Sequence, residues 1–159
     1  MAPAAVRFWR GAWLACYASA FVVGGTANAA GDPEARLHSA RSLRCTYTAQ
    51  VATWVRSGQR TVEQTTEAST LSYDNIDLTK GTARIIANGG ASDLTVWMEH
   101  TSGSLWMLER TASGNVVVTT VFPMYAGFTD EFVVLEARHS MVGVIALGQD
   151  TYGTCKVLE

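Results

Sequence analysis

The sequence predicts an all-β fold: a single antiparallel meander of about seven or eight strands, with a small barrel favoured over a sandwich, preceded by one short helix. Apolar and polar residues alternate with period two from Leu43 onward, as in half-buried strands. Clusters of Gly, Asn and Ser then recur at short intervals and mark tight turns. Thr and Val, which suit pleated strands, are frequent. A meander of this length must close or stack to hide its edges.

The first 29 residues read as a cleavable signal peptide. Arg7 and Arg10 precede an apolar run from Gly11 to Gly25, and Ala27 and Ala29 supply the small residues that signal peptidase requires. The run of 15 residues is shorter than the roughly 20 that a bilayer span needs, so we expect no stable membrane span after cleavage. Residues 30–159 then form a single exported β-domain, periplasmic or secreted.

The mature chain opens with a predicted helix and a first strand. Good helix formers follow Pro33 up to Arg41, and Asp32 is placed to cap them. The alternation of Leu43, Cys45 and Tyr47 with polar neighbours, continuing to residue 51, predicts a half-buried strand. Residues 57–69 are polar and poorly periodic, which predicts a loop with a weak strand around Val62.

Six further strands are expected between the turn signals. They cover residues 70–77, 82–87, 93–100, 104–110, 115–122 and 131–139, and they are separated by turns that contain Gly81, Gly89 and Gly90, Gly103, Gly114 and Gly127. The segment Met141–Leu147 is apolar on both parities and is interpreted as a connection that covers one barrel end. The strand that carries Cys155 then returns to the first strand.

The cysteine count agrees with an exported domain. Cys16 leaves with the signal peptide, so Cys45 and Cys155 are the only pair and can form one disulfide, which would pin the barrel closure. Two free thiols are the alternative. The absence of a CxxC motif or a His/Cys cluster excludes a recognisable metal site, and we expect no cofactor.

The net charge argues against nucleic acid and anionic membrane surfaces as partners. The whole chain has 12 basic and 14 acidic residues; without Arg7 and Arg10 the domain keeps 10 and 14, a formal charge of −4. Nucleic-acid binding normally needs a clustered basic face, and none is visible.

Several fragments together resemble an uncharacterised family of small exported proteobacterial proteins with no assigned activity. They are Cys45-Thr46-Tyr47, Ile76-Asp77-Leu78, Gly81-Thr82-Ala83-Arg84, Gly114-Asn115, Thr119-Thr120-Val121-Phe122, Arg138-His139 and Tyr152-Gly153-Thr154-Cys155. The resemblance covers most of the mature chain and implies an exported β-domain, without implying a mechanism.

Two histidines are candidate general bases, though no nucleophile motif accompanies them. His100 lies beside Glu99 and a serine-rich turn that could supply a hydroxyl partner. His139 shares parity with Val133 and Leu135 and would lie at the rim of the core if that face points inward, where a structural role is favoured over catalysis or ligand binding. On this interpretation Glu136 and Arg138 form an exposed pair.

Two tryptophans are candidate binding residues together with His139. Trp97 and Trp106 lie opposite in parity to the other large apolar residues of their strands, so both strands are apolar on both faces. Either the N-terminal helix or Met141–Leu147 covers the tryptophan face, or it forms an exposed aromatic patch for a protein or an apolar ligand.

These observations favour a non-enzymatic periplasmic binding or protein-interaction module, with a small apolar ligand or an envelope protein as partner. One alternative is a small hydrolase that uses a histidine base. Others are a structural envelope scaffold, or a protein similar in layout to the periplasmic lysozyme inhibitors, whose small barrels also bridge an early and a late cysteine.

Overall fold

The computed structural model describes residues 31–87, 89–111, 113–127 and 129–158, so the predicted signal peptide lies outside the described residues. The described chain contains one helix and nine strands, which are α1 (Pro33–Ser39), β1 (Leu43–Arg56), β2 (Gln59–Thr65), β3 (Ser69–Asp77), β4 (Thr82–Ala87), β5 (Gly90–Met98), β6 (Leu105–Arg110), β7 (Val116–Tyr125), β8 (Phe132–Val142) and β9 (Ile145–Val157).

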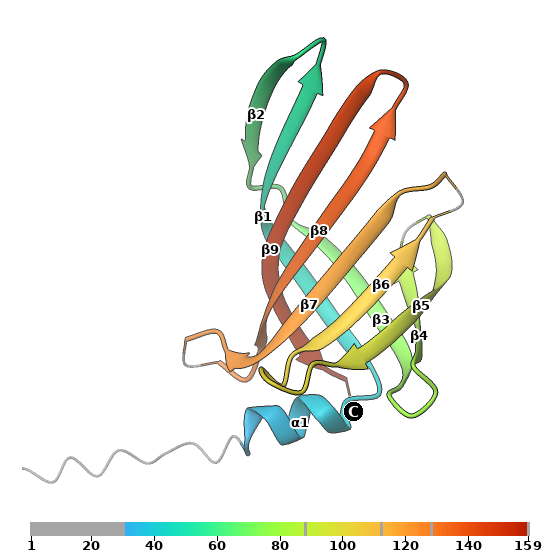
Figure 1. Ribbon diagram of the computed structural model, residues 1–159. Coiled ribbons are helices and arrows are strands. Elements are labelled where there is room, and N and C mark those ends of the chain that lie inside the picture. The colour runs from blue at the N-terminus through green and yellow to red at the C-terminus, as the bar shows by residue number, and fades with distance from the viewer. Residues whose placement is uncertain (1–30, 88, 112, 128, 159) are drawn as a thin grey trace, which may run out of the picture.

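The strands form an antiparallel meander that closes on itself. Neighbouring strands pair in the order β2-β1-β3-β4-β5-β6-β7-β8-β9, and β1 also pairs with β9. The closed part therefore contains eight strands, β1 and β3 to β9, while β2 is an additional strand outside the ring (Figure 1). The predicted all-β barrel with a short N-terminal helix is confirmed.

Strand β1 changes partner along its length. Residues 43–47 pair with β3, residues 50–56 pair with β2, and β9 follows the other edge through most of both halves. A bulge between Tyr47 and Ala49 marks the change. The far halves of β1, β8 and β9 together with β2 rise beyond the rest of the barrel, and we call this four-stranded part the extension (Figure 1).

Helix α1 closes the end of the barrel opposite the extension (Figure 1). Asp32 caps it by accepting a hydrogen bond from the Glu34 amide at 3.2 Å, and Pro33 occupies the first turn, as predicted. Leu37 is 1% exposed and joins the barrel core. Apolar side chains fill the interior near this end, including Leu43, Cys45, Ile76, Leu105, Val121, Phe132 and Cys155.

The predicted disulfide is confirmed at the seam of the barrel. Cys45 and Cys155 are bonded across 110 residues of sequence and lie directly opposite each other in the β1–β9 ladder. Gly153 lies two residues away, where the backbones of β1 and β9 approach so closely that a Cβ would overlap the Thr46 carbonyl oxygen. The two ends of the meander are thus joined by hydrogen bonds, by close packing and by a covalent bond.

The prediction of a loop over residues 57–69 was wrong, apart from the weak strand around Val62. Strand β1 continues to Arg56, turns at Ser57 and Gly58, and returns as β2. Both turn residues have positive φ, 50° and 78°, which is the pattern of a two-residue hairpin turn. Because nearly every residue of β2 is exposed, the strand has no buried face to impose an apolar alternation.

The prediction that Met141–Leu147 covers a barrel end was also wrong. The segment forms the β8–β9 hairpin at the tip of the extension, with a turn at Gly143, whose φ is 61°. Met141, Val142 and Val144 are between 64% and 79% exposed, so they cover nothing. The apolar pattern reflects β-branched strand residues around a turn glycine, since valine suits a strand whether or not it is buried.

Candidate functional site

The barrel interior has a filled half and an open half. Above the apolar core, toward the end that carries the extension, the strands border an open cavity of about 280 Å³ that we call the mouth. Its lining comes from β3, β4, β5, β6 and β8 and from the turns between them, and consists of Leu71, Ile85, Ala87, Gly89, Gly90, Ala91, Ser92, Glu109, Thr111, Asn115, Glu136 and Arg138.

A chain of hydroxyl groups next to the mouth ends on a buried carboxylate. The Tyr47 and Tyr73 hydroxyls lie 3.0 Å apart, and Tyr73 also lies 3.1 Å from Thr119 Oγ1. Tyr73 donates to Glu136 Oε2 at 3.5 Å. Tyr47 and Thr119 can then both donate to Tyr73, so that every hydroxyl proton has an acceptor. This network spans the barrel from β1 and β3 to β7 and β8.

The inward face of β8 is the opposite of the predicted one. Phe132 and Val134 are 0% and 1% exposed, and Glu136 on the same face is 5% exposed. The interpretation of Glu136 and Arg138 as an exposed pair was therefore wrong: both line the mouth, with 3.8 Å between Arg138 Nη2 and Glu136 Oε1. The alternation of residues along β8 did not identify the inward face because both faces are apolar, and Val133 and Leu135 lie on the outer face of the barrel.

Burial dominates the electrostatics of Glu136. It raises the pKa of this carboxyl above its ordinary value, while the nearby Arg138 guanidinium acts in the opposite direction. Burial likewise raises the pKa of the Tyr47 and Tyr73 hydroxyls, so both stay protonated at neutral pH. The network beside the mouth consists of hydrogen-bond donors and one carboxyl that is expensive to ionise.

Neither candidate histidine lies in the mouth. His139 is exposed on the outer face of β8, so the prediction that it lies at the rim of the core was wrong. His100 is exposed in the β5–β6 turn, where Ser102 donates to Ser104 at 2.8 Å. Glu99 accepts from the Thr101 and Ser102 amides, which lowers its pKa to about 2. Within the described residues, no hydrogen bond joins either imidazole to a nucleophile.

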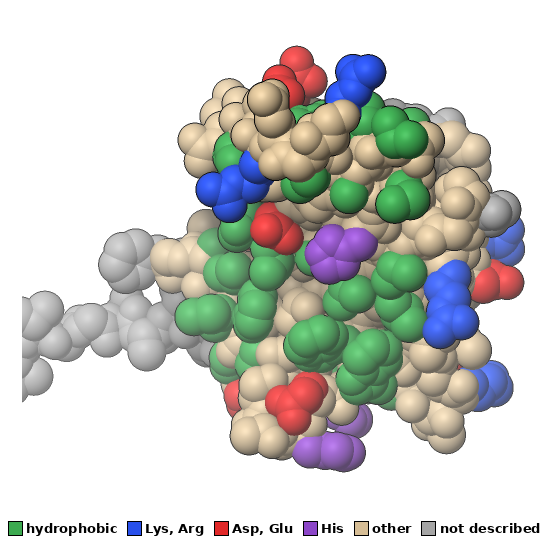
Figure 2. Space-filling view, turned by 45° about the horizontal axis from the view of Figure 1, so that its top comes forward, with side chains coloured by type: hydrophobic (Ala, Val, Ile, Leu, Met, Phe, Trp, Pro, Cys, Tyr) green, Lys and Arg blue, Asp and Glu red, His purple; other side chains and the backbone are tan. Residues whose placement is uncertain are grey.

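The two candidate tryptophans lie together on the outside of the barrel. Trp97 and Trp106 are cross-strand neighbours whose stacked rings are 5.9 Å apart, and Trp97 is 40% exposed. Their row continues through successive cross-strand neighbours from β5 to β9, a set we call the outer row: Trp97, Trp106, Thr120, Leu135 and Tyr152. Figure 2 shows hydrophobic side chains gathered on one face. Neither α1 nor the β8–β9 hairpin covers the outer row, since α1 closes the barrel end and the hairpin projects beyond it.

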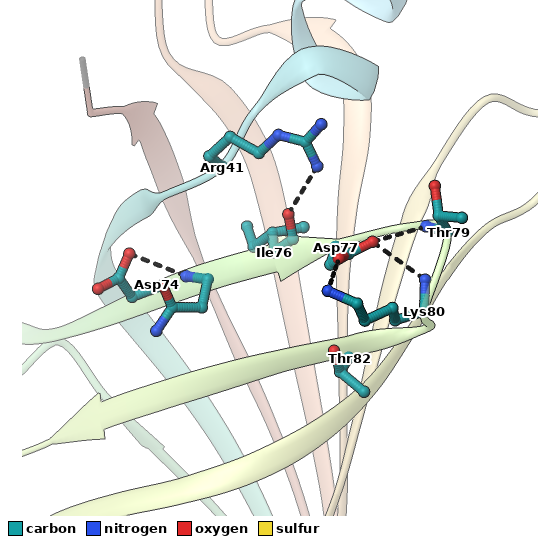
Figure 3. A pocket seen from close by; sticks show the side chains of 8 residues that line it. Arg41, Asp74, Ile76, Asp77, Thr79, Lys80 and Thr82 are labelled. Atoms are coloured by element: carbon teal, nitrogen blue, oxygen red, sulfur yellow. Dashed lines mark hydrogen bonds and ion pairs between the residues drawn. The ribbon is translucent and has the colours of Figure 1, made fainter.

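A larger surface hollow of about 660 Å³ lies beside the β3–β4 turn (Figure 3). Its polar groups bond to one another: Arg41 donates to the Ile76 carbonyl at 3.0 Å, and Asp77 accepts from the Thr79 and Lys80 amides and pairs with the Lys80 ammonium at 2.9 Å. The Asp74 carboxylate is held by Ser42 and the Asn75 amide. These contacts stabilise a bulged turn and leave few groups for a ligand, so the mouth is the better candidate.

Comparisons with protein-family models, with curated proteins and with solved structures find no match. The resemblance to an exported proteobacterial family therefore stays a prediction. No helix among residues 31–158, as far as they are described, is long and apolar enough to cross a membrane.

Sequence reasoning missed the residues that form the mouth. Tyr47 was placed on the buried side of the first strand, and Tyr73 reaches it from the paired strand β3. Thr119 and Glu136, which bond to Tyr73 beside the mouth, come from β7 and β8, and only barrel closure brings them there. One signal was present: Phe132, Val134, Glu136 and Arg138 share one parity, and an apolar strand face that ends in two charged residues is typical of a barrel interior that meets an opening.

Proposed function

We propose that this protein is a non-enzymatic binding module, exported to the periplasm, that takes a small ligand into the mouth of its barrel. The observation that carries the proposal is the cavity of about 280 Å³ beside a network of buried, mutually bonded polar groups. Small-molecule sites are commonly concave and largely apolar with a few placed polar groups, often at the open end of a barrel. The disulfide supports an oxidising compartment.

The chemistry of the mouth favours binding over hydrolysis. A hydrolase needs a nucleophile or an activated water within reach of a base. The Tyr47 and Tyr73 hydroxyls stay protonated and are bonded to each other, and both candidate histidines lie on the outside. The sequence led us to expect an apolar ligand; the charged groups of the mouth favour a ligand that also carries a polar group.

Native mass spectrometry of the protein purified from the compartment to which it is exported tests this proposal. We expect a co-purifying small molecule, and we expect Ala87→Trp to remove it by filling the mouth. Ile86→Trp is the matched control, because Ile86 is the preceding residue, is 45% exposed and points outward. Bare protein in repeated preparations, or a ligand that Ala87→Trp leaves in place, would contradict the proposal.

A second candidate function is protein recognition by the outer row. Trp97 and Tyr152 are 40% and 45% exposed at its two ends, and exposed aromatic clusters are common at protein interfaces. A photo-crosslinking residue placed at Trp97 should capture an envelope protein in the living cell, whereas one placed at the exposed, outward-facing Thr95 should not. Equal products from both positions would count against a specific interface.

A further inference from the structure

The mouth contains two carboxyl groups but only one basic side chain. Three charged side chains line it: Glu109, Glu136 and Arg138. Arg138 forms an ion pair with Glu136, and no ion pair or hydrogen bond to another described residue engages the Glu109 side chain. If both carboxylates are ionised, the mouth has a formal charge of −1, concentrated at Glu109.

The register keeps Glu109 away from Arg138. Val117 pairs with Arg138 on one side and with Glu109 on the other, so the two charged residues lie two strands apart in one row. Adjacent strands are about 4.8 Å apart, which places the two Cα atoms about 10 Å from each other. Glu109 is half-buried in a cavity that the apolar residues Leu71 and Ile85 also line, where water screens its charge less than on an open surface.

We infer that the ligand of the mouth is a small organic cation: an amine whose ammonium group binds Glu109 and whose apolar body lies along Leu71 and Ile85. This inference rests on the proposed function and names the chemical class of its ligand. An ammonium would give Glu109 the partner that it lacks among the described residues, whereas a carboxylate or phosphate would bring a second negative charge next to it. Arg138 forms an ion pair with Glu136 at 3.8 Å, and its buried Nε is a hydrogen-bond donor without a partner in the described part of the chain, which a neutral acceptor on the same ligand would satisfy.

The extension supplies an apolar surface on the same side as the mouth. Arg138, Gln149 and Ala52 are cross-strand neighbours on its inner face, and the next inner row contains Ser140, Leu147 and Trp54. Two residues along a strand correspond to about 7 Å. Trp54 is 36% exposed there. A ligand that reaches from the cavity toward this row meets an indole, which favours an amine with an aromatic or bulky apolar end.

Three probes of nearly equal size separate the alternatives: 2-phenylethylamine, 2-phenylethanol and phenylacetate. Each is titrated into the ¹⁵N-labelled full chain, purified from the exported fraction, with amide chemical shifts and calorimetry as readouts at pH 7. We expect the amine to shift mouth amides such as those of Ala91 and Ser92, to bind about tenfold more tightly than the alcohol, and phenylacetate to bind most weakly.

Two variants locate the ammonium. Glu109→Gln should lower the affinity for the amine about tenfold and leave the affinity for the alcohol unchanged. Asp93→Asn is the control, because Asp93 is an exposed carboxylate on the outer face of the neighbouring strand and its loss should change neither. The inference is overturned if the amine binds the natural chain no more tightly than the alcohol does. It is also overturned if the amine binds the natural chain and Glu109→Gln with equal affinity. If phenylacetate alone shifts the mouth amides, the cationic class is wrong while the proposed binding function stands.

Discussion

Removing the disulfide should destabilise the domain, and the length of the loop that the bond closes determines by how much. The bond joins Cys45 to Cys155 and closes a loop of 110 residues. The chain-entropy relation gives about 16 cal/mol/K for a loop of this length, or about 5 kcal/mol at 25 °C. Because small domains are stable by only about 5–15 kcal/mol, this is a large share of the total.

We expect the fold to persist in the reduced protein, because the β1–β9 ladder that closes the barrel consists of twelve residue pairs, of which Cys45 and Cys155 are one. The assay is urea unfolding of the Cys45→Ala/Cys155→Ala double variant and of the reduced natural chain. Reduction keeps both sulfur atoms in the core, so it isolates the loop entropy. The alanine variant adds a small cavity, since both cysteines are fully buried.

We expect reduction to lower the free energy of unfolding by about 5 kcal/mol. In a separate thermal unfolding experiment, the midpoint temperature should fall by about 15 °C. The free energy of unfolding should also fall more steeply with urea concentration, because the reduced unfolded chain exposes more surface. A loss below about 1 kcal/mol on reduction would refute the reasoning, since the unfolded chain would then gain little freedom from losing a constraint of 110 residues.

Two further substitutions test the packing and the charge of the barrel. Gly153→Ala should destabilise by about 2 kcal/mol or more in thermal unfolding, because the new Cβ would overlap the Thr46 carbonyl oxygen and lie 2.7 Å from Tyr47 Cα; Gly148→Ala, whose Cβ meets only His139 at 4.0 Å, is the control, and equal effects would remove the steric explanation. Glu136→Gln should change the pH dependence of stability. Because burial raises the pKa of Glu136 in the fold, its contribution is complete below its ordinary value near 4.5 and is lost as the pH rises through the native pKa. The natural chain should therefore lose stability relative to Glu136→Gln in urea unfolding as the pH rises above about 4.5, and a constant difference would show that the native pKa is not raised.

Local patterns predicted the parts of the fold that local forces determine. The helix capped by Asp32 and the strands between glycine turns were found because capping and positive φ are readable from neighbouring residues. Strand β2 was not predicted over its full length, because a strand that is exposed on both faces shows no alternation of apolar and polar residues. The seam was predictable only because two cysteines were available to mark it.

The candidate site depended on a choice of face that the sequence left open. On β8 the valine and leucine residues of one parity compete with Phe132 and Val134 of the other, and hydrophobicity alone does not rank them. Val133 and Leu135 point outward, and Leu135 belongs to the outer row, which is why an apolar face was taken for the core. The sequence placed Trp97 and Trp106 on the face opposite to the aliphatic residues of β5 and β6, and the structure shows that this face is the outer one.

The change of partner along β1 has a consequence for association between copies of this chain. Closure gives every strand of the ring a partner on both sides, although Ser140–Val142 of β8 pair with β9 alone in the extension. Strand β2 pairs with β1 alone, so in the described part of the chain its far edge presents a full strand of backbone donors and acceptors to solvent. Such an edge is a template for a foreign strand. The charged side chains of Arg60 and Glu63 make it a poor one, since Val62 is the only apolar residue of the strand. Substitutions that make β2 more apolar would therefore endanger solubility while leaving the closed ring intact.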